Sequence, residues 1–527
     1  MQTEMAASTH ASEPSEQDSR LRGERLLVFF FLALFVLMMA RLAWLSDDAY
    51  ITFRTVDNLT NGYGLTWNVA ERVQVYTHPL WMFVVSVFYF FTREIYFTTL
   101  ILSIAISATV ATLFAFRIAP TPAAAILGLA LMTFSKAFVE YSTSGLENPL
   151  SHLLLALYVV LFLKGERNLK WLSHVALLCA LAAFNRMDTL VFFLPGLVVG
   201  FQAIPRGGRV LALAKGFLPL LVWESFCFFY YGFLFPNTAY AKLNTGISSA
   251  DLAFQGVCYF MNSLNLDPLT LVVIAAGIAS AFSQRERRLL ALAIGGVLYL
   301  LYTLRIGGDF MSGRFLSTVF FMGLCLLASA HPLDLRGAAI GLLGLLLAGF
   351  FSPHAQHLLD LEHPLSKQTA VIDNKGVADE RAYYFPATGL AGISRGQALP
   401  YHAWALEGHD ARKQGHSVLV RDNIGLFGFY AGPDVHILDN WALADPLLAR
   451  LPMRAQDWRI GHFQRAIPAG YIATLESGEN RIEDPKIASY YDQLALITRG
   501  PLFSPRRLLT ALRMNLGWYD SLIESPN

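Results

Sequence analysis

Long apolar runs recur along this chain, and they restrict it to a membrane protein that crosses the bilayer many times. The first run, Leu26–Trp44, is long enough to span at about 1.5 Å per residue. Further runs lie at about 97–116, 122–138, 149–163, 171–184, 189–204, 211–231, 268–283, 289–304, 315–330 and 337–352. Composition agrees, because 15% of the 527 residues are charged, whereas soluble domains carry roughly a quarter. The sequence predicts a polytopic α-helical protein with about eleven transmembrane helices.

Basic residues predict which ends of these helices face the cytoplasm. Residues 1–24 are polar and precede Arg25, as in a disordered cytoplasmic tail. No small-residue cleavage site follows the first run, which indicates a signal anchor. The run Leu80–Phe91 is too short to span, and we expect a juxtamembrane or re-entrant helix on the outer side. With that assignment, residues 25–352 form the membrane domain. The clusters of basic residues between the predicted helices then lie on the cytoplasmic side.

After about residue 353 the chain changes character, because charges, histidines and turn residues become common. We expect residues 353–527 to form a soluble domain of mixed α/β type on the outer side. Its predicted elements are strands at His416–Val420 and Val435–Asp439, a helix at Ile424–Tyr430 and a closing amphipathic helix at Pro505–Ile523.

Two classes of partner are disfavoured by the remaining composition. The net charge is +1 and no stripe of Lys and Arg is interleaved with aromatic residues, which argues against nucleic acid. The four cysteines stand in no CxxC or Cys/His pattern, so no zinc site is predicted.

Two adjacent carboxylates, Asp47 and Asp48, follow the first span at its outer end. Carboxylates at the edge of a low-dielectric slab repel each other and are poorly solvated, which makes such a pair a functional candidate. One could take a proton from a sugar hydroxyl while the other positions the first or holds a cation. A divalent cation bound by both is a second possibility, and a pair of solvated caps at a helix start is a third.

Other outer segments add groups suited to a phosphorylated sugar. Tyr76 and His78 belong to an outer loop, 46–79, whose aromatic and amide side chains suit carbohydrate, although an interfacial aromatic belt would look similar. The candidate phosphate ligands are Arg54, Lys242, Arg305 and Arg314. The further candidate substrate contacts are Glu147, Arg186, Asp188, Asn237, Asp309 and His462. Arg186 and Asp188 could instead be a simple ion pair in a hairpin.

Several of these segments resemble one known family. Residues 47–81, with Asp-Asp-Ala-Tyr-Ile-Thr-Phe-Arg at their start, look like the first outer loop of the mycobacterial-type terminal β-(1→2)-arabinofuranosyltransferases, which are GT-C membrane enzymes. The segments 144–149, 235–242, 307–314, 378–390, 422–450 and 458–475 are also similar to that family. His78 and the hairpin Asn185–Asp188 depart from its pattern at positions that bear on sugar identity.

The resemblance implies an inverting transfer of D-arabinofuranose from a polyprenyl-phosphate donor, decaprenyl-phosphoryl-arabinose, to a sugar hydroxyl. It places the reaction and the C-terminal domain in the periplasm, at the inner (cell) membrane of a cell-wall-building bacterium. It implies Asp47 as the general base, with Asp48 beside it. The acceptor would be a glycan or a protein-linked sugar, with pilin left open.

Three other interpretations remain at the level of sequence. A transporter or flippase of lipid-linked sugars would have charges mid-membrane, broken helices and internal symmetry, which are not evident. A GT-C enzyme could use another polyprenyl-phosphate sugar. The C-terminal domain could also be a sugar-binding module on a structural membrane anchor.

Overall fold

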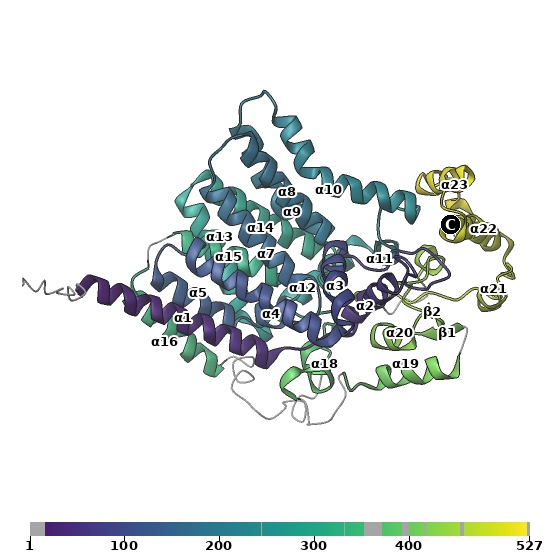
Figure 1. Cartoon of the computed structure of the whole chain (residues 1–527), viewed down its shortest axis with the longest axis horizontal. Helices are drawn as coiled ribbons and strands as arrows, with labels where there is room; N and C mark the ends of the chain where they lie inside the picture. The colour runs from purple at the N-terminus through teal and green to yellow at the C-terminus, as the bar shows by residue number, and fades with distance from the viewer. Residues whose placement is uncertain are drawn as a thin grey trace, which may run out of the picture.

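The computed structural model describes residues 16–243, 245–330, 333–351, 371–392, 400–415, 418–453 and 458–523. Long helices run side by side through most of the molecule, and the C-terminal helices gather at one end of them (Figure 1). Residues 1–15 of the expected tail and 353–370 of the expected C-terminal domain lie outside the described residues. Residues 16–24 are helical, contrary to the expected disordered tail, because they extend the first span with good helix formers such as Glu, Gln, Arg and Leu.

Every run that was expected to span contains a helix. These helices are α1 (Glu16–Leu42), α4 (Ile95–Leu113), α5 (Pro122–Phe134), α7 (Asn148–Lys164), α8 (Leu169–Asn185), α9 (Leu190–Ala203), α10 (Arg209–Tyr230), α13 (Pro268–Gln284), α14 (Arg287–Arg305), α15 (Leu316–Ala330) and α16 (Leu335–Phe351). By length and apolar character, four stretches of the described chain can cross a membrane, at Arg22–Leu42, Ile95–Ile118, Arg209–Tyr230 and Arg287–Arg305. The other apolar helices are shorter or bent, so eleven spans stays a prediction.

Two further helices lie among the spans without being counted as spans themselves. α3 (Pro79–Thr92) covers the short run Leu80–Phe91 and packs against α4 and against α2 (Asp47–Thr60). α12 (Ser249–Leu266) lies between the apolar runs 211–231 and 268–283, in the segment Phe235–Asp267 that the hydropathy pattern assigns to a polar outer loop, and it meets α13 at a bend of 108°. The loop assignment was wrong because α12 is amphipathic, with polar positions interrupting its apolar face. That face is exposed at Phe254, Val257, Met261 and Leu264, which follow helical spacing.

The C-terminal part contains α18 (Glu380–Thr388), α19 (Ala403–Gln414), β1 (Val418–Arg421), α20 (Gly425–Ala431), β2 (His436–Asp439), α21 (Tyr471–Ser477), α22 (Pro485–Arg499) and α23 (Pro505–Asn515). Its two strands pair in parallel, with Val418 opposite His436, and α20 connects them. Both predicted strands and the short helix are confirmed, although residues 416 and 417 lie outside the described chain. The predicted closing helix ends early, since Gly517 has a φ of +78° that continues no α-helix.

The C-terminal part packs directly on α2. Tyr384 of α18 and Leu426 of α20 belong to the same hydrophobic core as Trp44 and Phe53. α20 lies along α2, so the start of α2 is enclosed by residues that are more than 300 positions away in sequence. This packing fixes the surroundings of Asp47 and Asp48.

Candidate functional site

Asp47 is held by the start of α20. Its two carboxylate oxygens accept hydrogen bonds from the backbone amides of Gly425 (3.1 Å) and Leu426 (2.7 Å). A Cβ at Gly425 would lie 1.9 Å from the Asp47 carbonyl oxygen, so only glycine permits this approach. Burial raises the pKa of Asp47 to about 7, against the effect of the Leu426 amide. Asp47 therefore joins α2 to the C-terminal part, and both of its oxygens are already used.

Asp48 points into different surroundings. It is half-buried, and the charged groups that act on it are Arg314, Lys242, Asp309 and Glu147. Burial raises the pKa of Asp48, while Arg314 and Lys242 lower it and Asp309 and Glu147 raise it further. A carboxylate with a raised pKa beside cations is a better proton acceptor than an ordinary surface aspartate. The geometry thus favours Asp48 over Asp47 as the candidate base.

Behind Asp48 lies a closed group of buried charges centred on Glu147. Its carboxylate lies 2.8 Å from Arg186 Nη1, 3.2 Å from Arg314 Nη2 and 3.2 Å from His78 Nδ1. Arg186 also binds Asp188 at 2.8 Å, as the hairpin ion pair anticipated from the sequence. Burial alone would raise the pKa of Glu147, but Arg314, His78 and Arg186 lower it well below its ordinary value.

The tautomer of His78 follows from its two partners. Burial lowers the pKa of His78 to about 4, so the ring is neutral at pH 7. A carboxylate can only accept, so Nδ1 carries the proton toward Glu147, and Nε2 accepts from the Thr52 hydroxyl at 2.7 Å. His78 thereby ties α2 to the Glu147 group.

Lys242 of α11 (Asn237–Leu243) is the open cation of the site. Lys242 is an exposed residue, and its ammonium makes no hydrogen bond or ion pair with any residue that the structure describes. The surrounding protein lowers the pKa of Lys242 by desolvation, while Asp309 and Asp48 oppose that effect. The ammonium lies 5.9 Å from the centre of the Phe310 ring. An accessible cation with free donors suits a phosphate ligand.

The C-terminal part adds groups that sequence reasoning did not single out. Glu380, at the start of α18, is buried, and its pKa is raised well above the ordinary value by burial and then by Asp48. The Arg459 guanidinium lies 5.6 Å from the Phe310 ring and is among the charges that act on Glu380. His462 packs edge-on against the same ring at 4.6 Å. The segments 378–390 and 458–475 resemble the known family, but no local pattern marked Glu380 as a neighbour of Asp48 or Arg459 as a neighbour of Glu380.

Four of the sequence-predicted site residues serve other purposes. Arg54 was expected to bind phosphate, but it is buried and donates to the carbonyls of Trp67, Gly428 and Val435. Tyr76 shares a 2.7 Å hydrogen bond with Tyr231 in the core. Asn237 donates to three carbonyls of residues 442–445. Arg305 is exposed at the end of α14, and its side chain makes no hydrogen bond or ion pair with any residue in the described part of the chain. These side chains hold the fold together or face away, so we no longer count them as ligands.

The Asp47–Asp48 pair does not extend into a metal site. Within the described ranges, no group of three or more His, Cys, Asp or Glu side chains is arranged to hold an ion. Both carboxylate oxygens of Asp47 already accept hydrogen bonds from backbone amides. Two carboxylates pointing to different partners make a poor ligand set for a divalent cation, which takes six or more oxygen ligands.

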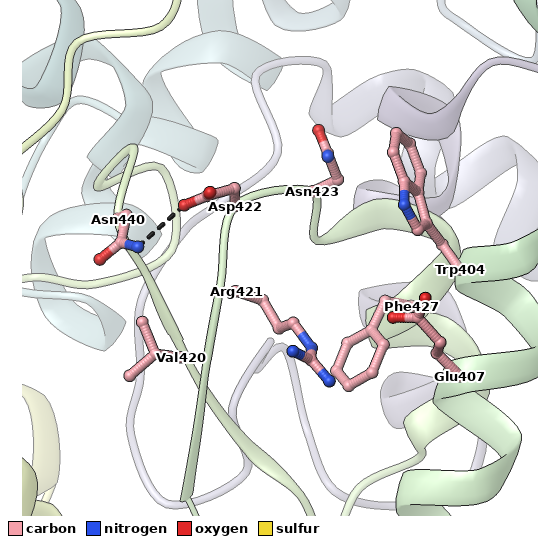
Figure 2. A pocket seen from close by; sticks show the side chains of 8 residues that line it. All are labelled: Trp404, Glu407, Val420, Arg421, Asp422, Asn423, Phe427 and Asn440. Carbon is pink, nitrogen blue, oxygen red and sulfur yellow. Dashed lines mark hydrogen bonds between the residues drawn. The ribbon is translucent and has the colours of Figure 1, made fainter.

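An open pocket of about 230 Å³ lies nearby in the C-terminal part. Figure 2 shows its lining side chains: Trp404, Glu407, Val420, Arg421, Asp422, Asn423, Phe427 and Asn440. The Asn440 amide donates to Asp422 at 2.8 Å, and the Arg421 guanidinium stacks 4.6 Å from the Phe427 ring. Residues 421–423 of this lining lead directly into Gly425 and Leu426, which hold Asp47. Aromatic faces beside amides and carboxylates suit a sugar with its hydroxyls.

Comparisons with known proteins agree with the resemblance. No family model matches the sequence. A terminal beta-(1->2)-arabinofuranosyltransferase of Mycobacterium tuberculosis is 27% identical, over 82% of this chain and 82% of the relative. The enzyme of the same name from Corynebacterium glutamicum is 26% identical, over 80% of this chain and 72% of the relative. The chain therefore resembles terminal arabinofuranosyltransferases along most of its length, as its motifs predicted.

Among solved structures, ArnT from Cupriavidus metallidurans, crystallised with undecaprenyl phosphate, aligns with a TM-score of 0.48 at 12% identity. The alignment covers 80% of this chain and 87% of that one.

Proposed function

We propose that this chain is an inverting membrane glycosyltransferase that transfers D-arabinofuranose from a polyprenyl-phosphate donor to a sugar hydroxyl. The observation that carries the proposal is the placement of the half-buried Asp48 beside the open cation Lys242. The two arabinofuranosyltransferase relatives support the choice of sugar and the reaction class. The basic clusters between the predicted spans are expected to lie on the cytoplasmic side, opposite Asp47 and Asp48. They therefore support a reaction on the outer side, in the periplasm, at the inner membrane.

In the proposed step, Asp48 accepts the proton of the acceptor hydroxyl as that oxygen attacks the anomeric carbon. The bond between this carbon and the phosphate oxygen breaks, and the polyprenyl phosphate leaves with the bonding electrons. Lys242 stabilises the charge that grows on the phosphate, and the Arg459 guanidinium also lies close to the Phe310 ring. One displacement with one base inverts the anomeric centre, and no nucleotide takes part.

The Glu147 group positions these two residues and does not touch substrate in this scheme. Arg314 is buried and engaged by Glu147 and Asp309, so it acts on Asp48 through its charge. We propose that the pocket beside Trp404 and Phe427 binds the acceptor, which is a glycan or a protein-linked sugar.

The test is transfer of labelled arabinose from a polyprenyl-phosphate donor to an oligoarabinoside, using the full chain in lipid nanodiscs. We expect Asp48→Asn to lower the rate by about 10³-fold or more, within the range for loss of a general base and of the charge beside the leaving group. Asp47→Asn should retain more activity and lose thermal stability instead, because its amide has one acceptor oxygen for two backbone donors.

Three outcomes would count against the proposal. Turnover that survives in Asp48→Asn but is lost in a stably folded Asp47→Asn would return the role of base to Asp47. Movement of the intact lipid-linked sugar across a liposome membrane, without transfer to any acceptor, would support a flippase. Transfer of a different sugar from the same lipid carrier would keep the reaction class and reject arabinose.

A further inference from the structure

The last helix, α23, presents an apolar face to the outside of the molecule. Leu509, Leu512 and Leu516 follow one another at helical spacing and are 47%, 46% and 63% exposed. Phe503 before the helix and Trp518 after it are 83% and 64% exposed. The opposite face, with Arg507, Ala511 and Met514, is buried.

This helix is fixed to the end of a membrane-length helix. The buried guanidinium of Arg507 donates to the carbonyls of Phe229 and Tyr230, which end α10, at 2.7 Å each. The Asn515 amide donates to the Gly232 carbonyl at 2.7 Å. Figure 1 shows α23 beside this end of α10. The position of α23 relative to α10 is therefore set by hydrogen bonds as well as by packing.

The exposed surfaces of the two helices are continuous. α10 is long and apolar enough to cross a membrane, and its exposed stripe includes Leu218, Leu221 and Val222. Two turns beyond Val222, the Phe229 ring lies 5.4 Å from the Phe503 ring. The stripe that would face lipid on α10 thus passes through this ring pair onto α23.

We propose that α23 lies in the outer membrane–water interface, with Leu509, Leu512, Leu516 and Trp518 among the lipid chains. Arg506 and Arg513 flank the leucines on one side of the helix, where they can reach lipid phosphates. Trp518 stacks 5.1 Å from the Arg513 guanidinium, an amphipathic pair typical of this depth. The contact would hold the C-terminal part against the bilayer on the side where the donor lipid is bound.

The continuity with α10 favours lipid over a protein partner. A protein that covered α23 would also have to cover the outer end of α10, where a bilayer is already expected. The inference rests on the proposed membrane placement of α10. The experiment below tests the position of α23 and the position of α10 with separate labels.

The test uses nitroxide labels on the full chain in nanodiscs of mixed zwitterionic and anionic lipid. Labels are placed at Leu512→Cys, at Leu221→Cys on α10 and at Lys486→Cys, an exposed position on the neighbouring helix α22. The background carries Cys258→Ser, because the other three cysteines are buried. Collision with oxygen, which concentrates in lipid, is compared with collision with a water-soluble nickel chelate.

We expect the oxygen-to-nickel ratio at positions 512 and 221 to exceed that at 486 several-fold. A lipid-like value at 221 with a water-like value at 512 overturns this inference and leaves the proposed function intact. A water-like value at 221 overturns the membrane placement of α10 itself. Protection from both reagents at 512 shows a protein cover, such as a second copy of the chain, and also rejects the inference.

A second measurement tests the arginines. Replacing anionic by zwitterionic lipid should lower the ratio at 512, and the double variant Arg506→Gln, Arg513→Gln should remove that dependence. No effect of lipid charge on the parent protein would overturn the assignment of these arginines to headgroups.

Discussion

Two groups of charges lie next to each other near the start of α2, and they differ in how completely they are paired. Around Glu147, the side chains of His78 and Arg314 are buried and that of Arg186 is half-buried, and all three contact the Glu147 carboxylate. Beside them, Asp48 and Lys242 influence each other electrostatically. Neither side chain makes a hydrogen bond or ion pair with another described residue. Charges that are already paired have little left to offer a substrate, whereas an open pair is stable only if something else can satisfy it. We infer from this difference that the Glu147 group supports the structure and that Asp48 and Lys242 are the groups available for chemistry.

We expect substitutions in the Glu147 group to affect mainly the stability of the protein. Glu147→Gln removes the carboxylate that contacts both Arg186 and Arg314, so each guanidinium loses a counter-charge and keeps only Asp188 or Asp309. We expect a loss of about 3–5 kcal/mol in the free energy of unfolding, measured by denaturation in detergent.

The matched control for Glu147→Gln is Glu479→Gln, which breaks the exposed pair with Arg481 (3.3 Å). It should cost less than about 1 kcal/mol. Equal effects of the two variants would show that the Glu147 group is not the scaffold described above.

The open pair should show the reverse behaviour. Lys242→Met removes the cation proposed to hold the leaving phosphate, and it breaks no hydrogen bond or ion pair within the described chain. We expect kcat to fall by about 10²-fold, as for loss of one donor to a developing charge, with no change in unfolding midpoint. Lys413→Met, at a 76% exposed lysine on α19, is the control and should leave both quantities unchanged. A large loss of stability in Lys242→Met would erase the distinction between the two groups.

The pH dependence sharpens the comparison further, because Asp48 must be ionised to accept a proton. Burial raises its pKa, so the acid limb of kcat/KM should lie above the ordinary range of an aspartate, and activity should fall as pH falls through it. Lys242 lowers this pKa and Asp309 raises it. Lys242→Met should therefore move the limb to higher pH and Asp309→Asn to lower pH, each by about one unit or less. Shifts in the same direction would show that the limb belongs to another group.

The sequence predicted the local features of the fold well. Apolar periodicity located each of the expected helices, and alternation located β1 and β2. It did not reveal α12, whose polar positions hide a helix inside an apparent loop. The sequence also could not show how the C-terminal part packs on α2, because contacts over more than 300 positions leave no local pattern.

The same limit explains the errors at the site. Asp47 and Asp48 are indistinguishable by residue type, and only the amides of Gly425 and Leu426 separate them. Arg54 looked like a phosphate ligand because an outward arginine is unusual, but its three carbonyl partners come from loops that sequence alone does not bring near it. The convergence of Glu147, Arg186, Asp309 and Arg314 was anticipated because each follows or precedes a span on the same side.

The pocket near Trp404 allows the smallest and most selective perturbation, because its lining includes no residue of either charge group. If it binds the acceptor, Trp404→Ala loses one stacking face, worth about 1 kcal/mol, and the KM for an oligoarabinoside should rise about five-fold. Leu406→Ala is the control on the same helix, since Leu406 is 48% exposed and does not line the pocket. The KM for the lipid donor and the acid limb should stay as in the parent protein, because Asp48 and Lys242 keep their surroundings. A rise in donor KM instead would place the lipid in this pocket and the acceptor elsewhere, and it would break the separation between the charged cluster and the sugar pocket.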